Sequence, residues 1–224
     1  MTQPHEIGEE ESAVGESDGG LSGLFARNRA WAEAKTLIDP GFFKRLVGQQ
    51  RPRYFWIGCS DSRVPATEIV DLDPGEMFVH RNVANLATPA DPNFAAALQF
   101  AVDVLKVEHI IVVGHYGCGG IQAAMTQDRD DAIGAWLAPV RLLHLAGCSA
   151  QEADADRLCE QNICAQVDEL AANPLIVDAW QRQASLTLHG WVYGIGDGLL
   201  QRVCTPMTSP QKKRAAPEPV EGSA

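Results

Sequence analysis

Two cysteines and a histidine have types and spacings that suit a metal ion. His115 and Cys118 stand on either side of a glycine-rich turn, in GHYGCGG, so both side chains can reach one ion. Cys59, which ends the apolar run YFWIGC, can join them from a neighbouring strand. Two thiolates and one imidazole form a soft ligand set that favours Zn2+ over Mg2+ or Ca2+. Since three protein ligands leave one tetrahedral position open, the set is typical of a catalytic zinc site.

Each of these residues also has a structural interpretation. Cys59 alone fits a buried thiol, because free cysteine is among the most buried residue types. The glycines around Cys118 could form a phosphate-binding loop, but they lack the G-x-G-x-x-G spacing and a following P-loop lysine. Asp61 alone fits the cap of a helical turn that begins near Pro65. The coincidence of these residues at two strand ends favours a metal site over the separate explanations.

The pattern of apolar residues predicts the elements that position these groups. Residues 53–59 and 109–115 are almost continuously apolar, which is typical of strands buried on both faces. Further strands are predicted at 77–82 and 185–194, and helices at 26–38, from Pro40, at 92–105, from Gly119, at 133–145 and at 156–171. Strands that alternate with helices indicate an α/β domain built on a largely parallel sheet. Cys59 and His115 then lie at carboxyl ends of strands, where open α/β sheets bind ligands.

The two ends of the chain differ in composition from the part between them. Residues 1–20 contain six acidic residues and no Lys or Arg, and residues 208–224 are rich in Pro and charge. We expect both to be disordered tails around one zinc domain at residues 21–207. The formal net charge of −11 argues against nucleic-acid partners and anionic membrane surfaces, because binding to phosphates needs clustered Lys and Arg. No stretch is long and apolar enough to span a bilayer.

The cysteines bear on the compartment. The irregular spacing of the six cysteines does not fit a disulfide scaffold in a chain of 224 residues. The N-terminal residues MTQPHEIGEEE lack the basic start and apolar middle of a signal peptide. We therefore expect a cytoplasmic protein with thiols that are free or bind metal. Two further pairs have no supporting partners and are interpreted as structural: His144 with Cys148, and Cys159 with Cys164.

Together the motifs resemble the β-class carbonic anhydrases. The segments CSDSR at 59–63 and HYGCGG at 115–120 carry the resemblance, and FVHRNVAN, AVDVLKVEHIIVVGH and LHGWVYGIGDGLL support it. The resemblance extends from about Leu21 to Leu200. It implies a mixed, mainly parallel β-sheet flanked by helices, with N-terminal helices packing on a partner subunit. A homodimer, often paired into a homotetramer, is also implied, with the active site near the dimer interface.

The resemblance assigns roles to individual residues. Cys59, His115 and Cys118 hold zinc, and Asp61 and Arg63 form a catalytic dyad beside it. The implied reaction is the reversible hydration of CO2 to bicarbonate and a proton by zinc-bound hydroxide, with the dyad orienting the zinc water. Because two thiolates cancel the charge of Zn2+, its water should be less acidic than at a histidine site, and we expect activity to rise towards alkaline pH.

One subgroup of this family binds bicarbonate at a second, non-catalytic pocket, and in its closed state the dyad aspartate replaces water on zinc. The matching residues here are Trp56, Arg81 and Tyr193, so allosteric inhibition by bicarbonate is implied. The structural alternative is that Trp56 and Tyr193 are core aromatics and that Arg81 is a surface charge. Gln50 matches a glutamine that lines the substrate pocket in some members, and the adjacent Gln49 is the alternative for this position.

Three other functions fit part of the pattern. Alcohol dehydrogenases also use a Cys2His site, but they need a nicotinamide site, and no dinucleotide fingerprint is present. Hydrolases of carbon disulfide or carbonyl sulfide share the scaffold and would differ in access to the pocket. A non-catalytic, zinc-stabilised protein that binds bicarbonate would not need the Asp61–Arg63 dyad. The dyad therefore favours an enzyme.

Overall fold

The structure of the chain is a computed structural model that describes residues 21–126, 129–147 and 154–209. The expected tail at residues 1–20, and all but the first two residues of the one expected at 208–224, lie outside the described residues. The chain divides between Gln49 and Gln50 into two compact units.

In its described residues, 21–49, the first unit consists of two helices, α1 (Leu21–Ile38) and α2 (Phe42–Val47). Phe42 is buried, and Phe43 makes edge-to-face contacts with Phe42 and with Trp31 at ring-centroid distances of 5.0 and 5.6 Å. The other large apolar side chains of the unit are mostly exposed: Leu21, Leu24, Phe25, Leu37, Ile38 and Val47. Two short helices cannot enclose a core of their own, so this unit leaves an apolar surface uncovered.

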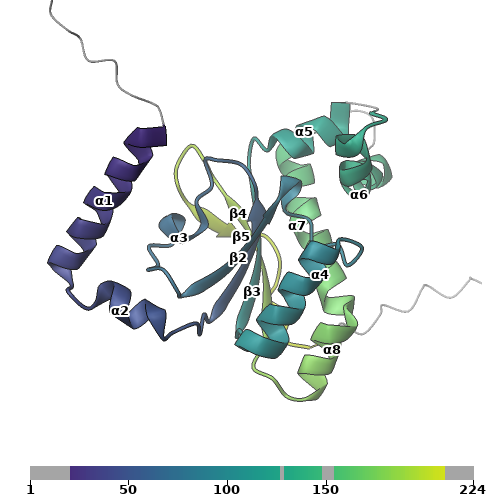
Figure 1. Cartoon of the computed structure of the whole chain (residues 1–224). Coiled ribbons are helices and arrows are strands. Elements are labelled where there is room, and N and C mark those ends of the chain that lie inside the picture. Colours follow the sequence, from purple (N-terminus) through teal and green to yellow (C-terminus); the bar gives the residue numbers. More distant parts are fainter. Residues whose placement is uncertain (1–20, 127–128, 148–153, 210–224) are drawn as a thin grey trace, which may run out of the picture. The chain divides into compact units, whose positions relative to one another are not determined.

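The second unit is built on a five-stranded sheet (Figure 1). The strands are β1 (Tyr54–Cys59), β2 (Met77–Asn82), β3 (His109–His115), β4 (Thr187–Tyr193) and β5 (Leu200–Arg202). Their order is β2-β1-β3-β4-β5, and every neighbouring pair is parallel except β4–β5. The expected mixed, mainly parallel sheet is confirmed. The sequence did not predict the short antiparallel strand β5.

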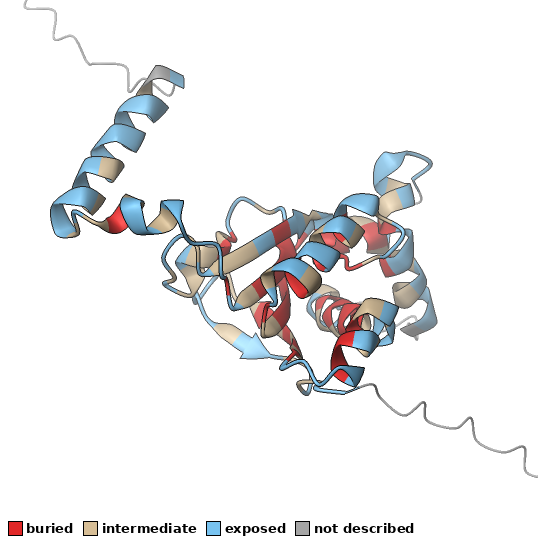
Figure 2. Ribbon diagram, turned by 60° about the horizontal axis from the view of Figure 1, so that its bottom comes forward, coloured by how far each residue is buried: buried red, intermediate tan, exposed pale blue. Residues whose placement is uncertain are grey.

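Helices flank this sheet, and the largest core lies between the sheet and most of them. The flanking elements are α3 (Ala66–Ile69), α4 (Pro92–Gln99), α5 (Gly119–Thr126), α6 (Ala132–Gly147), α7 (Ala155–Ala172) and α8 (Pro174–Gln181). Two irregular segments join them, a 3-10 turn η1 (Val83–Asn85) and a π-helical segment η2 (Phe100–Leu105) that continues α4. In Figure 2 the buried residues concentrate on the central strands and on the helix faces turned towards them.

The two faces of β1 serve different cores because successive side chains of a strand point to opposite sides. Phe55, Ile57 and Cys59 join the large core shared with α4, α5 and α7. Trp56 joins a smaller core on the other face, with Ile111 among its members. The almost continuously apolar sequence of β1 is thus explained by burial on both faces, as predicted.

Two of the cysteines differ from the expectation of free or metal-binding thiols. Cys164 on α7 and Cys204, just after β5, form a disulfide with their Cα atoms 5.9 Å apart. This disulfide could not be predicted from the sequence, because the two residues are 40 positions apart and meet only through the packing of α7 on the sheet. Cys59, Cys118 and Cys159 are free and buried, and Cys148 lies outside the described residues.

In the part of the chain that the structure describes, no helix combines the length and the apolar character that a membrane span requires.

Candidate metal centre

The three expected metal ligands meet at the carboxyl ends of two neighbouring parallel strands. Cys59 ends β1, His115 ends β3, and Cys118 follows in the turn before α5. Their ligand atoms all lie within 4.8 Å of one another, and the three residues are buried. The two sulfur atoms are 3.8 Å apart. Two Zn–S bonds of about 2.3 Å at a tetrahedral angle require a separation of about 3.8 Å, so the group fits zinc.

The imidazole of His115 is oriented for metal binding. Its Nδ1 hydrogen-bonds the backbone carbonyl of Tyr116 at 3.0 Å, which assigns the proton to Nδ1 and leaves the lone pair on Nε2. Nε2 is buried and has no hydrogen-bond partner among the described residues. The thiol of Cys159 on α7 donates to the carbonyl of His115 at 3.2 Å. His115 thus has a buried ring nitrogen without a hydrogen-bond partner among the described residues, and the bond from Cys159 fixes its backbone. Both features suit a metal ligand.

The two sulfurs share one proton, and their surroundings favour a thiolate at Cys59. The hydrogen bond between them lowers the pKa of Cys59 and, with burial, raises the pKa of Cys118. Backbone N–H groups of four residues also point at the sulfurs: Asp61, Ala84, Gly120 and Ile121. N–H donors stabilise a buried negative charge, as thiolate ligands need.

An ion pair lies beside the three ligands. Arg63 donates to Asp61 through Nε at 2.9 Å and through Nη2 at 2.7 Å, and its backbone N–H adds a third bond of 2.9 Å. The Arg63 guanidinium holds the pKa of the Asp61 carboxyl well below its usual range. Oδ2 of Asp61 is 3.7 Å from Nε2 of His115. An ionised, doubly anchored carboxylate therefore lies within reach of the metal group.

The three residues matched to a second bicarbonate pocket share one face of the sheet. The pairs Trp56–Val79 and Gly58–Arg81 between β1 and β2 put Trp56 and Arg81 on the same side, and the registers through β3 add Tyr193. Trp56 is fully buried and Tyr193 partly so. A Cβ atom on Gly58 would overlap the indole of Trp56, which shows that the ring lies over Gly58, the neighbour of Arg81.

Arg81 contacts the metal region from this face. Its Nε donates to the carbonyl of Cys59 at 2.8 Å, and its Nη2 donates to the carbonyl of Asp61 at 2.5 Å. Gln50, by contrast, is exposed in the segment before β1, and no hydrogen bond of the described residues joins it to the three ligands. Its expected place in the substrate pocket stays a prediction.

Residues 54–200 match the family model described as carbonic anhydrase. The chain belongs to the β-carbonic anhydrase family. A carbonic anhydrase of Emericella nidulans is 41% identical over 184 residues, which cover 80% of this chain and 81% of that one. The solved β-carbonic anhydrase of Coccomyxa superposes with a TM-score of 0.82 at 36% identity, over 85% of this chain and 89% of that chain. A tetrameric β-carbonic anhydrase of Sordaria macrospora has a TM-score of 0.77 at 35% identity, over 83% and 98%.

Membership of the family, with a Cys59–His115–Cys118 group that fits zinc, confirms the prediction of a zinc-dependent carbonic anhydrase. The sequence does not identify the residues of α7 that contact this region. Cys159, which donates to the carbonyl of His115, is interpreted from the sequence as structural, and Asn162, which donates to the carbonyl of Ala84, and the neighbouring Gln166 belong to no motif. A signal existed, since two amides at i and i+4 interrupt the apolar face of α7.

Proposed function

We propose that the chain catalyses the reversible hydration of CO2 to bicarbonate and a proton, with zinc on Cys59, His115 and Cys118. The observation that carries the proposal is the closeness of an ionised Asp61 to three convergent soft ligands, 3.7 Å from Nε2 of His115. A purely structural zinc site would be closed by a fourth protein ligand and would need no such carboxylate.

The chemistry divides between the metal and the dyad. Cys59, His115 and Cys118 would hold the zinc ion, which would lower the pKa of a bound water and so supply a hydroxide nucleophile. Asp61 accepts a hydrogen bond from the attacking water and so directs its lone pair towards CO2. Arg63 keeps this carboxylate ionised and away from the metal through two parallel charge-assisted hydrogen bonds. If Arg63 released it, Asp61, whose Oδ2 lies 3.7 Å from Nε2 of His115, could serve as a fourth ligand in place of water.

The test is the replacement Asp61→Asn, which keeps the size of the side chain and removes its charge. Stopped-flow CO2 hydration should fall by about 100-fold or more, the usual scale for a group acting on proton position, while zinc content stays near one per chain. Cys118→Ser should lose zinc, and Cys148→Ser serves as the cysteine control that should keep it. Full CO2 hydration activity in the Asp61→Asn variant would show that Asp61 does not direct the attacking water.

We also propose that Trp56, Arg81 and Tyr193 form a regulatory bicarbonate pocket. Support comes from their shared sheet face and from the bonds of Arg81 to the carbonyls of Cys59 and Asp61. An anion that takes the guanidinium of Arg81 would remove donors from the backbone that carries the dyad, and Asp61 could then reach the metal. Tyr193→Phe and Arg81→Gln should both weaken inhibition by bicarbonate. Unchanged inhibition in both variants would contradict the pocket.

We further propose a homo-oligomer assembled through the first unit. The support is its uncovered apolar surface and the tetrameric relative of Sordaria macrospora. Leu37→Asp, which places a charge on this surface where the side chain is 85% exposed, should lower the mass measured by light scattering. Glu33→Gln on the same helix is the control and should leave the mass unchanged.

The proposed location is the cytoplasm, where thiols stay reduced for zinc. The Cys164–Cys204 disulfide argues against the cytoplasm, because disulfides are rare in cytosolic proteins. Cell fractionation combined with alkylation of free thiols tests the location. Recovery of the protein in a non-cytoplasmic fraction, with this pair oxidised, would overturn the proposal.

A further inference from the structure

The turn after β2 lies against the metal group and has an uncommon backbone. Ala84 and Asn85 adopt left-handed conformations, with φ of 64° and 50°, although neither is glycine. Ala84 is fully buried, and its backbone N–H faces the sulfur of Cys59. A non-glycine residue keeps this conformation only where surrounding contacts hold it.

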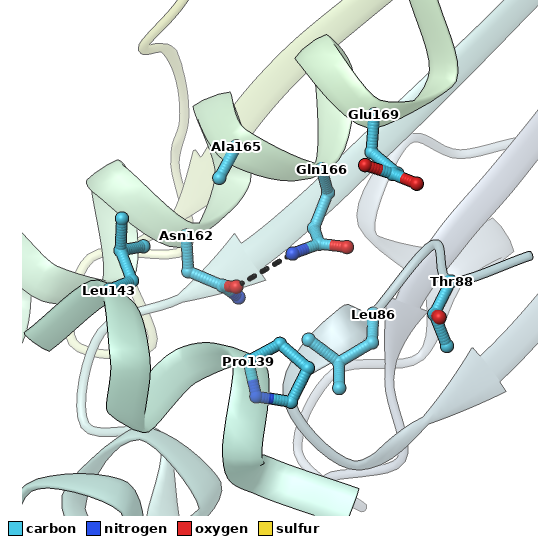
Figure 3. A pocket seen from close by; sticks show the side chains of 8 residues that line it. All are labelled: Leu86, Thr88, Pro139, Leu143, Asn162, Ala165, Gln166 and Glu169. Atoms are coloured by element: carbon cyan, nitrogen blue, oxygen red, sulfur yellow. Dashed lines mark hydrogen bonds between the residues drawn. The ribbon is translucent and has the colours of Figure 1, made fainter. Parts of the chain in front are cut away.

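Two amide side chains on α7 supply such contacts. Asn162 donates through Nδ2 to the carbonyl of Ala84 at 3.0 Å. Oε1 of Gln166 accepts from the N–H of Ala87 at 2.8 Å. Nε2 of Gln166 donates to Oδ1 of Asn162 at 3.0 Å, so the two amides act as one unit (Figure 3). With 1% and 8% of their surfaces exposed, Asn162 and Gln166 are buried polar groups. Asn162 bonds the turn itself, and Gln166 bonds the loop after it and holds Asn162 in place.

Packing does not replace these bonds. A cavity of about 350 Å³ lies beside the amide pair, between α6, α7 and the loop after η1. Figure 3 shows Leu86 and Pro139 across this cavity from the two amides. Because this cavity adjoins Asn162 and Gln166, an apolar side chain at either position would have few protein atoms on that side to pack against and would not fix the turn.

Hydrogen bonds therefore carry the constraint, and the two amides share it with Asn82 and Trp136. The side chain of Asn82 bonds the N–H and the carbonyl of Leu86 at 2.7 Å each, and Nε1 of Trp136 donates to the carbonyl of Val83 at 2.8 Å. The amides are the part of this network that comes from α7.

We propose that Asn162 and Gln166 are positioning residues for the metal centre. They hold the left-handed turn in the conformation in which the N–H of Ala84 points at the sulfur of Cys59. The inference rests on the proposed role of Cys59 as a zinc ligand. An N–H donor stabilises a thiolate and restricts its direction, and partners in this second layer commonly change metal affinity by about 10- to 100-fold.

The test compares Gln166→Met, which keeps the length of the side chain and removes both bonds, with Glu169→Gln. Glu169 lines the same cavity from the same helix, but it is exposed, and no hydrogen bond of the described residues joins it to the turn. Zinc affinity is measured by competition with a chromophoric chelator. The thiolate-to-metal charge-transfer band of the Co2+-substituted protein reports the sulfur directly. We expect about tenfold weaker zinc binding and a shifted band in Gln166→Met, and neither change in Glu169→Gln.

The outcomes separate the inference from the function it depends on. Absence of zinc and of the charge-transfer band in the unmodified protein would overturn the proposed ligand set itself. Native zinc affinity and an unshifted band in a folded Gln166→Met protein would overturn only the positioning role. If Gln166→Met does not fold, Asn162→Ser decides by the same two measurements, and native values there would likewise overturn the role.

Discussion

Replacing Arg63 by methionine removes both side-chain hydrogen bonds to Asp61 but leaves the backbone bond from residue 63 in place. The side chain of Arg63 is 54% exposed and that of Asp61 is 16% exposed, so solvent screens both bonds. Without them the Asp61 carboxylate keeps its charge but loses its fixed direction. We therefore expect turnover to fall by roughly 10- to 30-fold, less than the loss of about 100-fold or more expected for Asp61→Asn.

The assay is stopped-flow CO2 hydration from neutral to alkaline pH, with zinc content measured on the same samples. Because the dyad acts on the attacking water and not on the binding of CO2, the loss should fall on kcat with KM little changed. Arg63→Lys, which keeps the charge without the parallel pair of bonds, should lie between wild type and Arg63→Met. A kcat within about twofold of wild type, in zinc-loaded Arg63→Met protein, would refute the reasoning.

Three further predictions follow from separate parts of the second unit. Gly58→Ala should displace the indole of Trp56, lower the free energy of unfolding in urea by about 1–3 kcal/mol and weaken bicarbonate inhibition; unchanged inhibition would separate Trp56 from the pocket. Burial lowers the pKa of His189 from 6.5 to about 4, so only the unfolded chain takes up a proton between these values. Stability should therefore decline as pH falls from 6.5 to about 4, and His189→Gln should flatten that decline in urea titrations at several pH values. Reduction of the Cys164–Cys204 disulfide, which joins residues 40 positions apart, should destabilise the protein by up to about 4 kcal/mol, whereas the denaturation midpoint of Cys164→Ala should not respond to reductant.

The metal group could be predicted from the sequence because its members follow local rules. Cys59 and His115 end apolar strands, and parallel strands bring their carboxyl ends to one edge of the sheet. Cys118 follows His115 in a short turn, so one strand end positions both. Neither inference depends on knowing how the helices pack.

The supporting residues could not be predicted in the same way. Ala84 has no intrinsic preference for a left-handed conformation, so nothing in its own identity indicates the turn. The bond from Asn162 to this turn spans 78 positions, and it forms only because α7 packs next to η1. Likewise, the Cys164–Cys204 pair depends on the placement of α7 against β4, the strand that pairs with β5. Such contacts follow from the tertiary arrangement of helices, which the period of apolar residues leaves open.

The inner face of α7 has a consequence for how the protein tolerates mutation. Cys159, Asn162 and Gln166 recur at helical spacing. They hydrogen-bond the carbonyl of His115, the carbonyl of Ala84 and the N–H of Ala87, respectively. Substitutions along α7 should therefore show a period close to one helical turn in a saturation-mutagenesis screen for metal loading. Although α7 contributes no metal ligand, its inner face would then tolerate almost as few substitutions as the strands that contribute Cys59 and His115. A design that moves this metal centre into another scaffold would therefore have to include α7.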